Sequence, residues 1–81
     1  MNVKLTKYFE EQVLLRRPYL KISWCKEALE QPFYKESQPD GRIRYWIYVA
    51  DLGKYLRVVT LEDGETIHNA FPDRKFDRGS L

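Results

Sequence analysis

The chain has 81 residues, of which 43% are hydrophobic and 15% aromatic, and its formal net charge at pH 7 is +2. This length favours a single domain, because a second core would have too little surface to bury. A net charge this small does not by itself indicate nucleic-acid binding. The placement of the basic residues therefore matters more than their number.

The cysteine content and the first residues of the chain indicate where in the cell the protein is expected and which stabilising groups it can contain. Cys25 is the single cysteine, which excludes an intramolecular disulfide framework and paired zinc ligands. Residues 1–4 lack the apolar run of a signal peptide, and no segment reaches transmembrane length. The sequence therefore predicts a cytoplasmic protein without a membrane partner, and we expect neither a metal nor a cofactor.

Two helices are predicted in the first third of the chain. Thr6 is a good N-cap for a helix over 7–17, and Pro18 disfavours helical geometry in the residue before it. Ser23 is expected to cap a second helix over 24–30.

From residue 33 onward the hydrophobic period changes to two, which is typical of strands. Asp63-Gly64 is a strong hairpin signal between two such runs. Strands are predicted over 33–38, 42–50, 55–61 and 65–71, and the tail over 72–81 is expected to be frayed or ordered by a partner.

This order of elements predicts an α+β fold over residues 1–81. Two N-terminal helices would pack on one face of a four-stranded antiparallel meander sheet, in the order α-α-β-β-β-β.

Strand pairing can be predicted from the two turns. If Asp63 and Gly64 form the loop of the last hairpin, Val59 lies opposite His68, Arg57 opposite Ala70 and Leu56 opposite Phe71. If Leu52-Gly53 centres the preceding turn, Tyr48 lies opposite Arg57 and Trp46 opposite Val59.

These pairings divide the sheet into two faces. The apolar face, expected to meet the helices, carries Ile43, Tyr45, Ile47, Val49, Leu56, Val58, Ile67 and Phe71. The other face carries Arg44, Trp46, Tyr48, Tyr55, Arg57 and His68. Asn69 fits this division badly because it falls on the apolar face, unless a bulge turns it outward. A slip of one residue would exchange the two faces of the last strand.

Aromatic rings alternating with arginines on an open sheet favour binding of single-stranded RNA, since rings stack on bases and arginine neutralises phosphate. The predicted RNA-binding residues are Arg42, Arg44, Trp46, Tyr48 and Tyr55. The alternative is that Trp46 and Tyr48 pack against the tail or form an oligomer interface.

Three stretches carry a resemblance to a known family, namely 38–46, 55–64 and 68–74 (QPDGRIRYW, YLRVVTLEDG and HNAFPDR). Together they resemble short bacterial proteins similar to the RelE/ParE superfamily of toxins, and BrnT-like toxins in particular. The resemblance implies a sheet with two helices on one face and an activity that cleaves mRNA or blocks translation, with free or ribosome-bound mRNA and a cognate antitoxin as partners. The chain departs from the superfamily in lacking a C-terminal catalytic tyrosine, since its last aromatic residue is Phe76.

Metal-independent cleavage of RNA needs an acid or base and a positive charge at the phosphate. The ordinary pKa of histidine lies near neutral pH, so His68 is the candidate acid or base, while Arg57 and Arg74 are candidates for charge stabilisation. The structural alternatives are a surface histidine beside Val59, an ion pair of Arg57 with an acid such as Asp73, and a solvated Arg74.

Three functions therefore remain open from the sequence. The first is a toxin of a type II toxin–antitoxin system that binds and cleaves mRNA. The second is a toxin of the same fold that blocks a protein target. The third is a small, non-catalytic binding or regulatory module.

Overall fold

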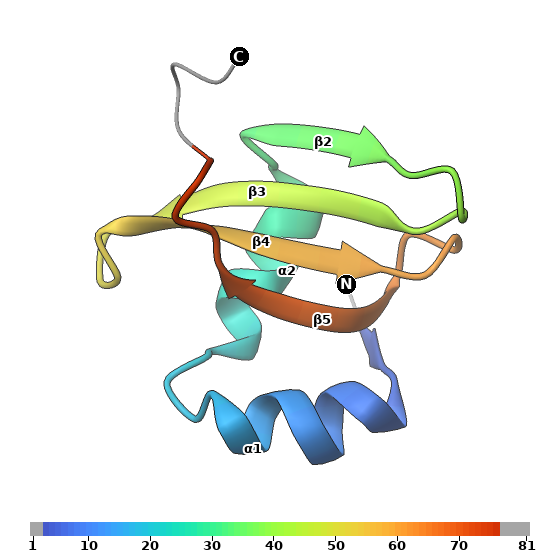
Figure 1. Ribbon diagram of the computed structural model, residues 1–81, viewed down its shortest axis with the longest axis horizontal. Helices are drawn as coiled ribbons and strands as arrows, with labels where there is room; N and C mark the ends of the chain where they lie inside the picture. Colours follow the sequence, from blue (N-terminus) through green and yellow to red (C-terminus); the bar gives the residue numbers. More distant parts are fainter. Residues whose placement is uncertain (1–2, 77–81) are drawn as a thin grey trace.

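The computed structural model describes residues 3–76, which form an α+β fold with the helices on one face of a five-stranded mixed sheet (Figure 1). The strands lie in the order β1-β5-β4-β3-β2. The elements are β1 (Lys4–Leu5), η1 (Phe9–Val13), α1 (Leu14–Arg16), α2 (Ile22–Glu30), β2 (Tyr34–Ser37), β3 (Ile43–Val49), β4 (Lys54–Thr60) and β5 (Thr66–Pro72).

The prediction of a purely antiparallel, four-stranded sheet was wrong at the N-terminus. β1 precedes the helices and pairs in parallel with β5, with Lys4 opposite Thr66 and Leu5 opposite Ile67. A strand of two residues is too short to show a hydrophobic period, so the sequence carried no signal for it. The four predicted strands correspond to β2–β5, each within one or two residues of its expected bounds.

The first helix begins as predicted, but its central turns are wider than those of an α-helix. The Thr6 hydroxyl accepts a hydrogen bond of 3.0 Å from the backbone N–H of Phe9, which is the capping bond expected of this residue. The segment over 7–16 is helical and contains the π-helical stretch η1 before α1.

The second helix begins earlier than expected, and its predicted cap was wrong. α2 starts at Ile22, so Ser23 lies inside the helix. The N-cap residue is Lys21, which has an extended backbone and makes no side-chain capping bond.

The core lies between the helices and one face of the sheet. The buried helical residues are Phe9, Val13, Cys25 and Ala28, with Leu20 from the connection between the helices. They pack on the inward-facing residues of the three central strands, which are Tyr45, Ile47, Val49, Leu56, Val58, Ile67 and Ala70. Burial also raises the pKa of the Cys25 thiol to about 12.

The turn between β3 and β4 shifts the predicted pairing by two residues. The loop comprises the four residues 50–53, so Trp46 lies opposite Arg57 and Tyr48 opposite Tyr55. Leu52-Gly53 was therefore the wrong centre for the turn. Because the shift is even, the predicted faces of these two strands are correct.

A β-bulge at His68 shifts the pairing of β4 with β5 by one residue. Next to the turn, Thr60 lies opposite Ile67, in the register that Asp63-Gly64 predicted. Beyond His68, however, Val59 lies opposite Asn69 and the remaining pairs follow that shifted register. His68 is thus the extra residue on the bulged strand.

The bulge corrects the predicted faces of the last strand. Ala70 is fully buried opposite Val58, on the side of the helices. Phe71, which was predicted to face the helices, lies opposite Arg57 on the other face. Asn69 is turned away from the core, and its side-chain oxygen accepts a hydrogen bond of 2.9 Å from the N–H of Ala70. The anticipated bulge therefore explains how the chain avoids burying this amide.

Within residues 3–76, none of the helices combines the length and the apolar character that crossing a membrane would require.

The two helix starts can be compared by mutation. We expect Thr6→Ala to lower the free energy of unfolding by about 1 kcal/mol, because it removes an N-cap hydrogen bond. Ser23→Ala is the matched control and should change stability by no more than about 0.5 kcal/mol, since Ser23 caps nothing and alanine favours a helix interior. Urea denaturation followed by circular dichroism measures both. A larger loss for Ser23→Ala would contradict the assigned helix starts.

Candidate functional site

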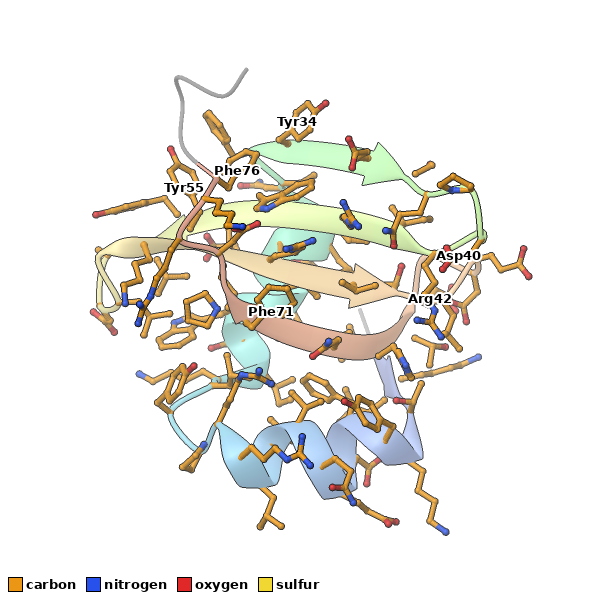
Figure 2. The ribbon with its side chains drawn as sticks, in the orientation of Figure 1. Tyr34, Asp40, Arg42, Tyr55, Phe71 and Phe76 are labelled. Atoms are coloured by element: carbon orange, nitrogen blue, oxygen red, sulfur yellow. The ribbon has the colours of Figure 1, made fainter. Side chains whose placement is uncertain are left out.

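The sheet face turned away from the helices, here called the open face, carries a cluster of aromatic side chains. The cluster contains Phe33, Tyr34, Trp46, Tyr48, Tyr55 and Phe76, which come from β2, β3, β4 and the segments beside them. Figure 2 shows Tyr34, Tyr55 and Phe76 gathered above one end of the sheet. The arrangement brings together rings that are distant in the sequence.

Trp46 lies at the centre of this aromatic cluster. Its ring stacks on Phe76 with centroids 4.7 Å apart and an interplanar angle of 12°, and Tyr34 packs beside it at 5.5 Å. These contacts leave Trp46 only 4% exposed, although it lies on the open face. Trp46 therefore packs against the tail segment, as in one of the structural alternatives described.

The prediction of a frayed tail from residue 72 was wrong for the part that the structure describes. Pro72 belongs to β5, and the segment 73–76 folds over the open face. The N–H of Asp73 donates a 2.8 Å hydrogen bond to the carbonyl of Tyr55, which fixes the segment beside β4. Residues 77–81 of the predicted tail lie outside the described residues.

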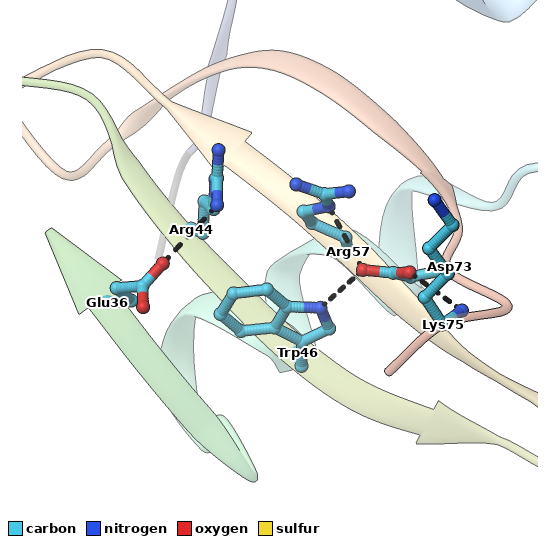
Figure 3. Close-up of polar contacts among 6 residues, drawn as sticks. All are labelled: Glu36, Arg44, Trp46, Arg57, Asp73 and Lys75. Atoms are coloured by element: carbon cyan, nitrogen blue, oxygen red, sulfur yellow. Dashed lines mark hydrogen bonds and ion pairs between the residues drawn. The ribbon is translucent and has the colours of Figure 1, made fainter. Parts of the chain in front are cut away.

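One carboxylate joins this segment to the two central strands (Figure 3). Asp73 Oδ2 accepts a hydrogen bond of 3.1 Å from the indole Nε1 of Trp46 and lies 3.3 Å from Arg57 Nε, while Oδ1 accepts the N–H of Lys75 at 3.1 Å. Burial favours a higher pKa for Asp73, but the bond from Trp46 and the charge of Arg57, together with backbone N–H groups, hold its pKa below the usual value.

Arg57 is fixed by its neighbours on the open face. Its guanidinium carbon lies 4.5 Å from the centroid of the Phe71 ring and 5.9 Å from that of Trp46. The pairing with Asp73 is an ion pair without hydrogen-bond alignment, since the buried Nε has no hydrogen-bond partner within residues 3–76. Arg57 therefore has the structural pairing that the sequence left open as an alternative.

Arg44 is also held by its surroundings. Its Nη1 lies 3.3 Å from Glu36 Oε1 across the β2–β3 pair. With the Gln38 amide oxygen turned toward it, Arg44 also donates to that oxygen from Nε at 2.8 Å. This contact orients the guanidinium at the edge of the aromatic cluster.

A shallow groove of about 320 Å³ lies between these groups. Its lining residues are Tyr34, Glu36, Arg44, Trp46, Arg57, Asp73, Lys75 and Phe76. Of the residues that the structure describes, three cations and two carboxylates line the groove, and their formal charges add up to +1. The groove combines ring surfaces with a small positive charge.

His68 lies apart from this groove. Its Nδ1 is 3.2 Å from the Thr6 hydroxyl, and its ring packs on Tyr8 with centroids 5.0 Å apart. Partial burial lowers the pKa of His68, and the nearby charge of Arg42 lowers it further. The prediction that His68 shares the open face with Arg57 was therefore wrong, because the bulge redirects it toward the first helix.

The other predicted residues are also distributed over the molecule. Arg42 lies beside Asp40 at the end of the sheet away from Tyr55 and Phe76 (Figure 2). Arg74 lines a different pocket, together with Arg17 and Lys54. The three candidate catalytic residues thus occupy three different surroundings, whereas Arg44, Trp46, Tyr48 and Tyr55 do lie on one face.

Sequence reasoning missed three contributors to the open face. Tyr34 and Phe33 lie in or beside β2, the edge strand, and their alternation in a four-residue strand is weak. Phe76 follows the last strand and reaches the face only through the fold of 73–76. The available signal for Phe76 was an aromatic residue within a tail that carries five charged residues.

No group of His, Cys, Asp and Glu suited to holding a metal ion occurs within the part of the chain that the structure describes. Comparisons with protein-family models, with curated proteins and with solved structures gave no match to this chain.

The contacts of Asp73 predict that its removal destabilises the protein more than the removal of Glu36 does. Asp73→Ala should lower the free energy of unfolding by about 1–3 kcal/mol at neutral pH, because it leaves the buried indole N–H of Trp46 without an acceptor and the half-buried Arg57 without its ion pair. Glu36→Ala removes an exposed ion pair and should cost less than about 1 kcal/mol. Chemical denaturation followed by circular dichroism distinguishes them, and equal effects would contradict the central role of Asp73.

The surroundings of His68 predict a pH dependence. Because its pKa is lower in the folded state, its contribution to stability is complete above the unfolded pKa of about 6.5 and is lost as the pH falls through the folded pKa. NMR titration of the ring should give a pKa below about 6.5, and Arg42→Ala should raise it. His68→Gln should make stability less dependent on pH over this window. A ring pKa above the ordinary value would contradict the assigned surroundings.

Proposed function

We propose that the chain binds single-stranded RNA through the open face of its sheet. The observation that carries the proposal is that the aromatic cluster lies on the face that the helices leave uncovered. Aromatic rings stack on bases of any sequence, and an open sheet presents them to bases that are not paired.

The rings have different roles in this proposal. Trp46 and Phe76 stack on each other and form the floor of the cluster, so Trp46 supports the surface and has little area left for a base. Tyr34, which packs beside Trp46, is 38% exposed, and Tyr48, which joins the cluster through Tyr55, is 54% exposed. These two tyrosines are the proposed stacking residues.

Charge makes a modest contribution to the proposed binding. Arg44 and Lys75 lie along the groove where phosphates would pass, while Glu36 and Asp73 offset part of their charge. We therefore expect a weak salt dependence, with the slope of log K against log salt near −0.7 for each phosphate neutralised.

The positions of the titratable groups favour binding over cleavage. Acid–base cleavage needs a proton-transferring group and a cation at the same phosphate. His68 contacts Thr6 and Tyr8, whereas Arg57 is paired with Asp73. Of the candidate functions, a non-catalytic RNA-binding role is therefore the one we propose first.

The setting we propose is that of a toxin-like protein of a type II toxin–antitoxin system. The support for this setting is the resemblance of 38–46, 55–64 and 68–74 to RelE/ParE proteins. In this setting the RNA is mRNA, free or on the ribosome, and a cognate antitoxin binds the protein.

The RNA proposal predicts the effect of single tyrosine substitutions. Tyr34→Ala and Tyr48→Ala should each weaken binding of a labelled oligouridine by about 5- to 150-fold, which corresponds to the roughly 1–3 kcal/mol of one stacked base. Fluorescence anisotropy measures the affinity. Tyr8→Ala is the matched control, since Tyr8 is also an exposed tyrosine but contacts His68 away from the groove.

Incubation of the same RNA with the protein tests the absence of cleavage. We expect the oligouridine to stay intact, and His68→Gln to leave both its affinity and its integrity unchanged. Loss of affinity with Tyr8→Ala alone would overturn the assignment of the open face. Cleavage that disappears in His68→Gln would overturn the non-catalytic role in favour of a ribonuclease.

The toxin setting is tested by expressing the protein in bacteria. Arrest of bacterial growth on expression, lost in Tyr48→Ala, would support this setting.

A further inference from the structure

A second pocket, of about 410 Å³, lies where β4 begins and β5 ends. It is built from three segments: the connection between α1 and α2, the turn leading into β4, and the end of β5. We call it the basic pocket, and its lining residues are Arg17, Tyr19, Leu52, Lys54, Phe71, Pro72 and Arg74.

The charge of the basic pocket distinguishes it from the groove on the open face. Of the residues that the structure describes, Arg17, Lys54 and Arg74 line it and no carboxylate does, so these lining residues carry a formal charge of +3. Within residues 3–76, none of these three cations forms an ion pair with a carboxylate. The acids next to it in sequence are engaged elsewhere, Asp73 with Arg57 and Asp51 with Lys21 at 4.0 Å.

The pocket is also partly preorganised. The guanidinium carbon of Arg17 lies 5.8 Å from the centroid of Phe71, the same ring that supports Arg57. A guanidinium held on a ring loses less freedom when it binds an anion. Tyr19, which is 45% exposed, adds a second ring to the wall.

We propose that the basic pocket binds a phosphoryl group. Three cations that line one pocket attract a compact, multiply charged anion, and guanidinium groups match the oxygens of a phosphate with paired hydrogen bonds. The phosphoryl group can come from a free phosphorylated compound or from the 5′ end of an RNA strand. The site is separate from the RNA-binding groove and does not require it.

Binding of inorganic pyrophosphate at constant ionic strength tests the pocket itself. The expected result is saturable shifts, in NMR spectra, of the backbone amides that flank the pocket, namely those of Arg17, Tyr19, residues 52–54, Phe71, Asp73 and Arg74. Arg74→Ala should weaken this binding by about 10-fold or more, because Arg74 is exposed and its loss removes a charged contact without disturbing the core.

Arg16→Ala is the matched control. Arg16 is the neighbour of Arg17 and carries the same charge, but it does not line the pocket. Its removal should leave pyrophosphate affinity within about 2-fold of the wild type, which is far below the change that a direct contact makes. Absence of saturation, or equal losses for Arg16→Ala and Arg74→Ala, would overturn the proposal.

The source of the phosphoryl group can be identified by comparing the affinities of two oligouridines, one with a 5′-phosphate and one with a 5′-hydroxyl. Tighter binding of the 5′-phosphorylated strand, with the difference abolished by Arg74→Ala, identifies an RNA end. Equal binding of both strands, with pyrophosphate still saturating, identifies a free phosphorylated compound. Tyr48→Ala separates the two sites, because it should weaken RNA binding and leave pyrophosphate binding unchanged.

Discussion

One extra residue in β5, His68, decides which side chains of the last strand reach the core. Without the bulge, Ile67 and Asn69 would both face the helices, and an amide would have to be satisfied in an apolar layer. With it, Ile67 and Ala70 fill the core, while Phe71 reaches the open face beside Arg57. The ring of Phe71 then supports arginines belonging to two different surfaces, Arg57 in the groove and Arg17 in the basic pocket.

The open face depends on a second contact, the carboxylate of Asp73. It fixes the segment 73–76 across β3 and β4 through Trp46 and Arg57, and so places Phe76 on the indole ring. Most of the area of Trp46 is used in this way to hold the chain together. What remains for a partner is the rim of the cluster, where Phe33, Tyr34 and Tyr48 are exposed. The face is therefore a supported surface and not a deep site, which suits a strand of bases better than a small substrate.

The sequence predicted the strands well where the alternation of hydrophobic and polar residues extended over enough positions to be recognised. β3 and β4 alternate over seven residues, so their faces were correct even though the turn at 50–53 was wider than expected. β1 and the 73–76 segment were missed because their structure comes from tertiary pairing, which no local pattern encodes. The grouping of His68 with Arg57 failed for a related reason. A register shift of one residue exchanges the two faces of a strand. The bulge that produces this shift was recognisable only from the misplaced Asn69.

The burial of Cys25 has a consequence for how opening of the molecule can be followed. The thiol lies in the centre of the core, fully shielded, and its raised pKa keeps it protonated at neutral pH. Alkylating reagents attack the thiolate, so they need both access and ionisation. Modification must then wait for the helices to separate from the sheet, and its rate under native conditions reports that opening event. The chain thus contains its own single-site probe of conformational opening, positioned away from both proposed binding surfaces.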